Sequence, residues 1–205
     1  ADLRLAATVP SWRPGTGYAF FDERRYFAWL PSVPRGTVEG TVTVGGVERR
    51  VSGVGYHDHN WGNAALPALV HDWYWGRARL GDYTAIASFI TATDRYGGAA
   101  LPVFMLARGD TIVADDAARV RFSAEDVFTD PHTGKPVAGR LTYEYEDGAV
   151  RYRVAFLRSA DIARTRFVDL LSGMPRFLAR LAGFDGAYLR FRGTATLERF
   201  EGGRL

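Results

Sequence analysis

Most residues that can do chemistry lie in two short stretches of the chain. Residues 55–62 read Gly-Tyr-His-Asp-His-Asn-Trp-Gly, and residues 71–77 read His-Asp-Trp-Tyr-Trp-Gly-Arg. Together the two stretches hold three of the four histidines and three of the five tryptophans. Titratable groups among indole rings are unusual for a plain hydrophobic core, because a buried histidine or aspartate without partners is costly. These two stretches are therefore the candidate site.

The first stretch predicts a carboxylate with an aromatic hydroxyl beside it. In an extended strand, Tyr56 and Asp58 share one face, whereas His57 and His59 share the other. Gly55 invites a β-bulge, so the alternation does not decide which face points inward. One interpretation is acid catalysis by Asp58, with Tyr56 as its hydrogen-bond partner. At the ordinary pKa of ~3.9, the protonated form at pH 7 costs roughly 4 kcal/mol, and burial beside indole rings reduces that cost.

Two other interpretations use the same residues. His57 and His59, with His71, have the residue types and spacing to bind Zn or Fe through three imidazoles, or through two imidazoles and a carboxylate. No further ligand motif accompanies them, and we predict neither a metal nor another cofactor. The second alternative is structural: the polar side chains bond to strand ends, and the tryptophans fill a corner where two sheets meet.

A period-two pattern dominates the rest of the chain and predicts β-strands. Gly45-Gly46 and Asp147-Gly148 predict hairpins. One helix is predicted at 175–182, with Pro175 in its first turn, Gly183 as its cap, and Phe177, Leu178 and Leu181 facing the core. Residues 159–171 are a second, alternative helix. The predicted strands cover residues 18–21, 26–30, 37–44, 47–51, 73–77, 83–91, 102–107, 111–114, 120–122, 141–146, 150–157 and 187–200.

About a dozen strands with frequent turns predict an all-β, antiparallel barrel fold with one or two short helices. The Gly- and Pro-containing stretch 62–67 is the predicted domain boundary. We expect residues 1–62 to be the terminal strands of a first lipocalin-like domain together with the junction motif. We expect residues 63–205 to form a second lipocalin-like β-barrel domain, since they hold enough strands to close one.

Composition narrows the classes of function. The 205 residues are 47% hydrophobic and contain no cysteine, which excludes disulfides, thiolate catalysis and cysteine-based zinc sites. The net charge is only +3, and acidic residues are interleaved with the arginines, so we predict no nucleic-acid partner. No apolar run is long enough to span a bilayer. A cytoplasmic or membrane-peripheral location is expected, and the oligomeric state is not predicted.

At these motifs the chain resembles a known family. It is similar to the lipocalin-like proteins that include carotenoid 1,2-hydratase (hydroxyneurosporene synthase) and AttH-type bacterial proteins, with fungal pericyclases of the Diels–Alderase type as distant relatives. The resemblance implies part of a two-barrel protein. In the hydratases, a Tyr-x-Asp pair and a His-x-Trp pair are catalytic; Tyr56 and Asp58 match the first, and Phe27 replaces the histidine of the second. The matching segments are residues 26–29, 33–36, 38–41, 52–62, 73–77 and 183–188.

The resemblance implies a barrel that binds a hydrophobic small molecule of the terpenoid, polyene or fatty-acyl type. We predict acid-catalysed addition of water to a C=C bond, with a pericyclase or a non-catalytic lipid carrier as alternatives. Peripheral contact with a membrane would give access to such a substrate. The predicted catalytic residues are Asp58, Tyr56, His57, His59 and His71, with the histidines orienting the carboxylate or binding water. The predicted substrate-binding residues are Phe27, Trp29, Trp61, Trp73, Trp75 and Arg77.

Overall fold

Strands make up most of the protein, as the period-two pattern predicts. The computed structural model describes residues 1–148, 150–181 and 184–201. The strands are β1 (Asp2–Ala7), β2 (Tyr18–Phe20), β3 (Tyr26–Val44), β4 (Val47–Gly62), β5 (Val70–Leu80), β6 (Tyr83–Ala92), β7 (Ala100–Arg108), β8 (Thr111–Ala114), β9 (Val120–Glu125), β10 (Phe128–Thr129), β11 (Pro136–Val137), β12 (Arg140–Asp147), β13 (Val150–Arg166) and β14 (Ala187–Glu201). The helices are α1 (Gly173–Leu181) and the short 3₁₀ turns η1 (Leu66–Ala68), η2 (Asp94–Tyr96), η3 (Ala117–Arg119) and η4 (Phe167–Leu170).

The chain divides into two compact units. The first comprises Ala1–Arg121 with Tyr145–Asp147, and the second comprises the described parts of Phe122–Glu144 and Gly148–Leu205. The boundary expected after residue 62 falls inside the first unit, between β4 and β5. As a division into two lipocalin-like domains, it stays a prediction.

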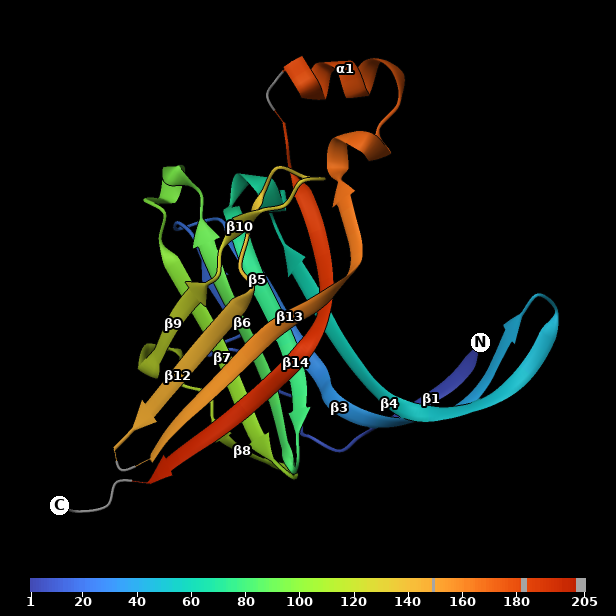
Figure 1. Ribbon diagram of the computed structural model, residues 1–205, viewed down its shortest axis with the longest axis vertical. Helices are drawn as coiled ribbons and strands as arrows, with labels where there is room; N and C mark the ends of the chain where they lie inside the picture. Colours follow the sequence, from blue (N-terminus) through green and yellow to red (C-terminus); the bar gives the residue numbers. More distant parts are fainter. Residues whose placement is uncertain (149, 182–183, 202–205) are drawn as a thin grey trace. The chain divides into compact units, whose positions relative to one another are not determined.

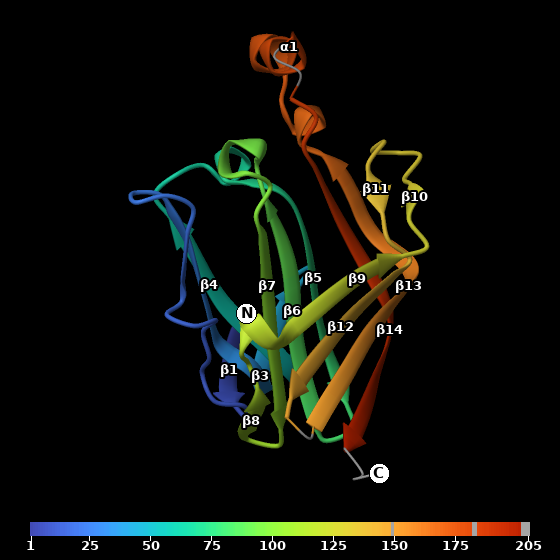
Figure 2. The same ribbon diagram turned by 90° about the vertical axis from the view of Figure 1, so that its left-hand side faces the viewer.

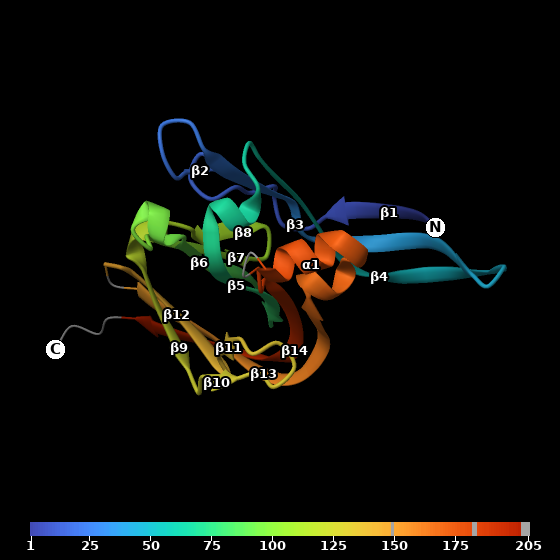
Figure 3. The same ribbon diagram turned by 90° about the horizontal axis from the view of Figure 1, so that it is seen from above.

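The first unit contains two antiparallel sheets. One has the order β1-β3-β2 with β4 paired to the long strand β3, and the other has the order β5-β6-β7-β8. Figure 1 shows β3 and β4 as neighbours joined by a tight turn, and Figure 3 shows β1 beside them. Figure 2 shows β5 to β8 side by side. Gly45 and Gly46, both at positive φ, form the turn between β3 and β4 and confirm the predicted hairpin.

Strand β3 joins two segments that were expected to be separate strands. Residues 26–30 and 37–44 form one strand with register shifts between Leu30 and Val33 and between Val33 and Gly36. The shifts absorb the prolines at positions 31 and 34, because a bulge leaves residues out of the hydrogen-bond ladder. The strand therefore continues where the sequence suggested an interruption.

The two sheets of the first unit share a core. Trp12 and Trp29 pack with Ile86, Val103 and Met105 of β6 and β7, and all five side chains are buried. Trp29 comes from β3, so this core holds the β3–β4 pair against the β6–β7 pair. It places one face of β3 and β4 in an apolar environment.

The second unit contains the sheet β14-β13-β12-β9 and the small pair β10-β11. The alternative helix at 159–171 is wrong: β13 continues as a strand to Arg166, and η4 follows it. In β13, Asp161 pairs with Arg158 and Arg164, three positions to either side, across register shifts between Arg158 and Ala160 and between Asp161 and Ala163. A bulge brings side chains three positions apart to the same side, as a helical turn does.

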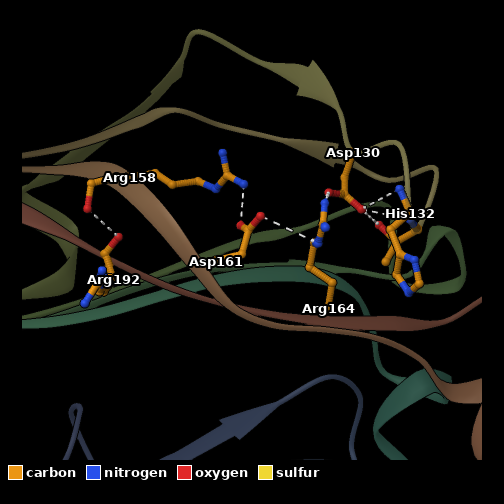
Figure 4. A network of polar contacts seen from close by, with 8 residues as sticks. Asp130, His132, Arg158, Asp161, Arg164 and Arg192 are labelled. Atoms are coloured by element: carbon orange, nitrogen blue, oxygen red, sulfur yellow. Dashed lines mark hydrogen bonds and ion pairs between the residues drawn. The ribbon is translucent and has the colours of Figure 1, made fainter.

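Figure 4 shows the polar network that holds this bulged strand. Arg164 of β13 bonds to Asp130 at 3.1 Å and lies 3.6 Å from Asp161, which also pairs with Arg158. Asp130 is almost fully buried. Burial alone would raise its pKa, but hydrogen bonds from Thr133 and the contact with Arg164 outweigh burial and lower the pKa to about 2. The network anchors the loop that carries Asp130 to β13.

Helix α1 begins two residues before its predicted start. The predicted core contacts are wrong, because Phe177, Leu178 and Leu181 are 61%, 53% and 74% exposed. An amphipathic pattern shows that one helix face is apolar but not that another element covers it. The predicted cap at residue 183 lies outside the described residues. In the part of the chain that the structure describes, no helix has the length and apolar character needed to cross a membrane.

Candidate functional site

The alternation of β4 decides which side chains of the first motif point inward. Tyr56 packs against the core formed by Trp12 and Trp29, and Asp58 lies half-buried two residues later on the same face. His57 and His59 are exposed on the opposite face. The sequence did not decide which face of this strand points inward, and the structure shows that it is the face of Tyr56 and Asp58.

The Asp58 carboxylate accepts hydrogen bonds from three different side chains. The Trp29 indole N–H donates to Oδ2 of Asp58 at 2.7 Å, the Tyr56 hydroxyl donates at 2.9 Å, and Asn60 donates at 3.4 Å. The register explains this convergence, since Trp29 of β3 lies opposite Asn60 of β4. Among the described residues, the three bonds all end on the same oxygen of Asp58. The predicted pairing of Tyr56 with Asp58 is present, and Trp29 is a direct donor as well as an apolar wall.

The Tyr56 hydroxyl is held in its protonated form. Burial raises the pKa of Tyr56 far above its ordinary value, and the hydrogen bond to the Asp58 carboxylate raises it further. A phenol in this state donates a proton to a hydrogen bond across the whole physiological pH range. The structure therefore makes Tyr56 a fixed donor toward Asp58.

Trp12, which the sequence did not single out as a site residue, packs against Trp29. The Trp12 and Trp29 rings meet edge to face with centroids 6.2 Å apart. The Trp12 N–H donates to Asp115 at 3.0 Å. Trp12 lies outside any strand, in a segment without periodicity, so only its residue type could have drawn attention to it.

Strand β5 supplies the opposite rim of the site. The Trp75 ring lies 5.6 Å from the Tyr56 ring, and the Arg77 guanidinium lies 5.0 Å from the centre of the same ring. Trp75 is 41% exposed and Arg77 is also exposed. Phe27 and Trp73 pack together against a second small core formed by Leu69, Val70 and Ile90. Four predicted substrate-binding residues, Phe27, Trp29, Trp75 and Arg77, thus lie on or beside the inner face that carries Asp58.

The remaining predicted site residues lie elsewhere. His57 bonds to Ser32 through Nδ1 at 2.7 Å, and the rings of His59 and Trp61 are 5.2 Å apart on the outer face of β4. His71 bonds to the neighbouring Asp72 at 2.6 Å, and both side chains are exposed. Instead of these histidines, Tyr56, Trp29 and Asn60 orient the Asp58 carboxylate.

The metal-site alternative, with three imidazoles or with two imidazoles and a carboxylate, finds no geometric support among the described residues. Among the described residues, no group of three or more histidine, aspartate or glutamate side chains is placed to hold a metal ion. His57 and His59 belong to β4, whereas His71 belongs to β5 and is bonded to its own neighbour.

Two surface cavities are lined by residues outside the Asp58 cluster. One, of about 270 Å³, is lined by His132 and residues 161–164. The other, of about 400 Å³, is lined by residues 22–25 and Arg95. The Asp58 cluster lines neither of them.

With this geometry established, comparison with known proteins identifies the family. A family model described as Diels-Alderase-like matches residues 8–169, most of the chain and all of the Asp58 cluster. The chain belongs to the Diels-Alderase-like family. The sequence resemblance placed such proteins among distant relatives and carotenoid hydratases nearer, so the family match corrects that order.

Two curated relatives match the chain over part of their own length. This Diels-Alderase-like chain is 29% identical over 178 residues to the quinolone epoxide rearrangement protein asqO of Emericella nidulans, covering 85% of the chain and 47% of that protein. It is 37% identical over 92 residues to the acyclic carotenoid 1,2-hydratase of Cereibacter sphaeroides, covering 45% of the chain and 29% of that protein. The chain thus spans half or less of the length of these relatives.

Solved structures confirm the fold class. An AttH protein from Nitrosomonas europaea matches 96% of the chain and 56% of its own, with a TM-score of 0.59 and 16% identity. Kievitone hydratase from Nectria haematococca matches 98% of the chain and 60% of its own, with a TM-score of 0.51 and 15% identity. CghA matches 92% of the chain and 56% of its own, with a TM-score of 0.55 and 13% identity. The predicted antiparallel, lipocalin-like β fold is confirmed.

Proposed function

We propose that this Diels-Alderase-like chain carries the proton-transfer site of an enzyme that converts a hydrophobic, conjugated small molecule. The observation that carries the proposal is the convergence of the Trp29, Tyr56 and Asn60 donors on one oxygen of Asp58. Such convergence fixes the orientation of the carboxylate, and positioned acid–base groups typically contribute ~10²–10⁴-fold to a rate.

The hydrogen bonds assign different roles to the two oxygens of Asp58. Oδ2 is occupied as an acceptor, so Oδ1 is the oxygen that exchanges a proton with the substrate. In a hydration, the proton moves from Oδ1 to one alkene carbon and leaves a cation on the other. Water adds to that cation, and its surplus proton returns to Asp58, which restores the acid. The rings of Tyr56 and Trp75 face the developing charge, and a desolvated cation–π contact is worth about 2 kcal/mol.

The relatives are consistent with one shared first step. A quinolone epoxide rearrangement protein and an acyclic carotenoid 1,2-hydratase both match this chain. Opening an epoxide and hydrating an alkene are both accelerated by a proton delivered from a positioned acid. A single arrangement around Asp58 therefore serves either substrate class, and this supports the hydratase-type interpretation.

The family match favours a second candidate, a pericyclase. A Diels–Alder-type cyclisation moves electrons within the substrate and needs no proton transfer. It needs a site that holds the reacting ends together and a donor that polarises the substrate. Tyr56 and Trp29 are such donors, and in this case Asp58 only orients them.

Replacing Asp58 by asparagine separates the candidates. Wild-type protein is incubated with a quinolone epoxide and with an acyclic carotenoid, and products are followed by liquid chromatography and mass spectrometry. Hydration adds the mass of one water, and rearrangement or cyclisation gives an isomer with a new retention time. We expect Asp58→Asn to lose ~10²–10⁴-fold in turnover while still binding the substrate. The matched control is Asp82→Asn in the exposed turn after β5, which should keep its turnover.

Two other outcomes would contradict the proposed acid role of Asp58 or the proposed enzyme function. Full turnover by Asp58→Asn would show that Asp58 is not the acid and would favour the pericyclase. Stoichiometric binding by wild-type protein, with mass and retention time of both compounds unchanged, would identify a carrier and overturn the proposed enzyme function.

A further inference from the structure

Arg77 reaches the candidate site through the Tyr56 ring. Its guanidinium carbon lies 5.0 Å from the centre of that ring, and the Tyr56 hydroxyl bonds in turn to Asp58. Trp75 precedes Arg77 by two positions on the same face of β5, and its ring also lies beside the Tyr56 ring, with centroids 5.6 Å apart. The two rim residues and the Tyr56–Asp58 pair therefore form one continuous surface.

The Arg77 guanidinium forms no ion pair with a carboxylate of the described chain. Some arginines of the chain are paired: Arg153 contacts Glu144 at 2.7 Å, and Arg164 contacts Asp130 at 3.1 Å. In the described part of the protein, Arg77 forms no such ion pair and is held instead by its cation–π contact with Tyr56. A guanidinium has five N–H donors in its plane, and stacking on a ring leaves donors available to a ligand.

The unpaired guanidinium conflicts with the proposed chemistry unless the substrate brings a compensating charge. A cation forming beside Tyr56 would be repelled by Arg77, which occupies a position over the same ring. An anionic oxygen on the substrate removes this conflict, because it pairs with Arg77 through charge-assisted hydrogen bonds. The exposed Trp75 ring next to it offers a flat apolar surface.

We propose that Trp75 and Arg77 form a subsite for a flat, conjugated substrate that bears an anionic oxygen, such as a carboxylate, enolate or phenolate. The substrate ring lies against Trp75 while its oxygen accepts from the guanidinium of Arg77. This inference rests on the proposed function only in placing the ligand beside Asp58, and it names the substrate class more closely.

The subsite is tested by binding alone, with two probes of the same ring and different charge. 1-Naphthoate and 1-naphthalenemethanol are titrated into the 205-residue protein at pH 7, and dissociation constants are taken from calorimetry. We expect wild-type protein to bind naphthoate about 10-fold more tightly than the neutral alcohol, as one charge-assisted contact provides. Arg77→Met should abolish the preference and leave the affinity for the alcohol unchanged.

Two further variants complete the test. Arg77→Lys keeps the charge but loses the planar donors, and should retain part of the preference. Arg79→Met is the matched control: Arg79 is exposed two positions further along β5 and bonds to the Gly81 carbonyl at 3.2 Å. It should behave as wild type, and circular dichroism confirms that all variants are folded.

Equal affinity of wild-type protein for both probes would overturn the subsite. Loss of the preference in Arg79→Met to the same extent as in Arg77→Met would also overturn the subsite. The preference for naphthoate would then depend on the overall positive charge of the protein and not on Arg77. A preference that persists in Asp58→Asn, with turnover unchanged, would leave the subsite intact and reject only the acid role of Asp58.

Discussion

Trp29 bonds to Asp58, which lies 29 positions further along the sequence, and this single indole defines much of the site. Its ring is buried to 5% exposure against Trp12, while its N–H reaches Oδ2 of Asp58 at 2.7 Å. A hydrogen bond to a charged acceptor contributes about 1.5–3 kcal/mol, more than a neutral one. Trp29 therefore stabilises the core and orients the carboxylate at the same time.

Replacing Trp29 by phenylalanine should separate these two roles. The ring remains, but the donor to Asp58 is lost, so we expect a loss of about 1–3 kcal/mol in unfolding free energy, measured in urea. We also expect roughly 10-fold slower turnover, because Asp58 is less firmly oriented. Trp12→Phe loses an indole bond to Asp115 in the same cluster and should lower stability while keeping turnover. Equal losses of turnover in both variants would contradict an orienting role of Trp29.

Sequence reasoning reached part of this site. The i,i+2 spacing of Tyr56 and Asp58 was enough to predict that they share a face and bond to each other, and they do so at 2.9 Å. The contact of Trp29 with Asp58 depends on how β3 pairs with β4, and register over such a distance is not visible in local spacing. The histidines were assigned to Asp58 by proximity in sequence, although alternation directs His57 and His59 to the other face.

At the scale of elements, the sheet that carries Asp58 depends on close approach of its strands. Gly40 of β3 has a φ of +151°, and a Cβ at this position would collide with the backbone oxygen of Asp2 in β1. Gly53 of β4 lies in the same sheet, where an added Cβ would meet open space. The two glycines thus look alike in sequence and differ in what surrounds them.

Gly40→Ala should therefore destabilise the sheet and Gly53→Ala should not. We expect Gly40→Ala to lose at least about 1–3 kcal/mol of unfolding free energy, from the strained backbone alone. Gly53→Ala should change it by less than about 0.5 kcal/mol. Chemical denaturation of both variants measures the difference. A loss in Gly53→Ala as large as that in Gly40→Ala would show that the β1–β3 contact is not the cause.

Elements were predicted well where the local pattern and the tertiary environment agree. Strand β8 has the expected bounds, and the Gly45-Gly46 turn forms the expected hairpin. Prediction failed where tertiary structure overrides the pattern. The segment predicted as a helix at 159–171 is the bulged end of β13 followed by η4, and the apolar face of α1 lies exposed. Neither the bulge nor the missing cover leaves a local trace in the sequence.

At the scale of the whole molecule, we expect the 26 basic residues not to form a phosphate-binding surface, because acidic residues are interleaved with them. Arg153 contacts both Glu144 and Glu198, and Arg119 contacts both Asp116 and Asp147. Nucleic-acid binding requires a surface of one sign that releases many counterions. We expect that a net charge of +3 distributed in this way does not provide such a surface.

We therefore expect wild-type protein to bind duplex DNA with a Kd weaker than about 10⁻⁴ M at physiological salt, measured by fluorescence anisotropy. A control variant changes the charge of one surface cavity. This cavity is lined by two acidic and three basic residues, Asp22, Glu23, Arg24, Arg25 and Arg95. Glu23→Lys turns this cavity strongly positive and should raise the affinity, because it removes the interleaved acid and adds a cation. Micromolar binding by the wild type, with a steep salt dependence, would mean that interleaved acids do not cancel the arginines.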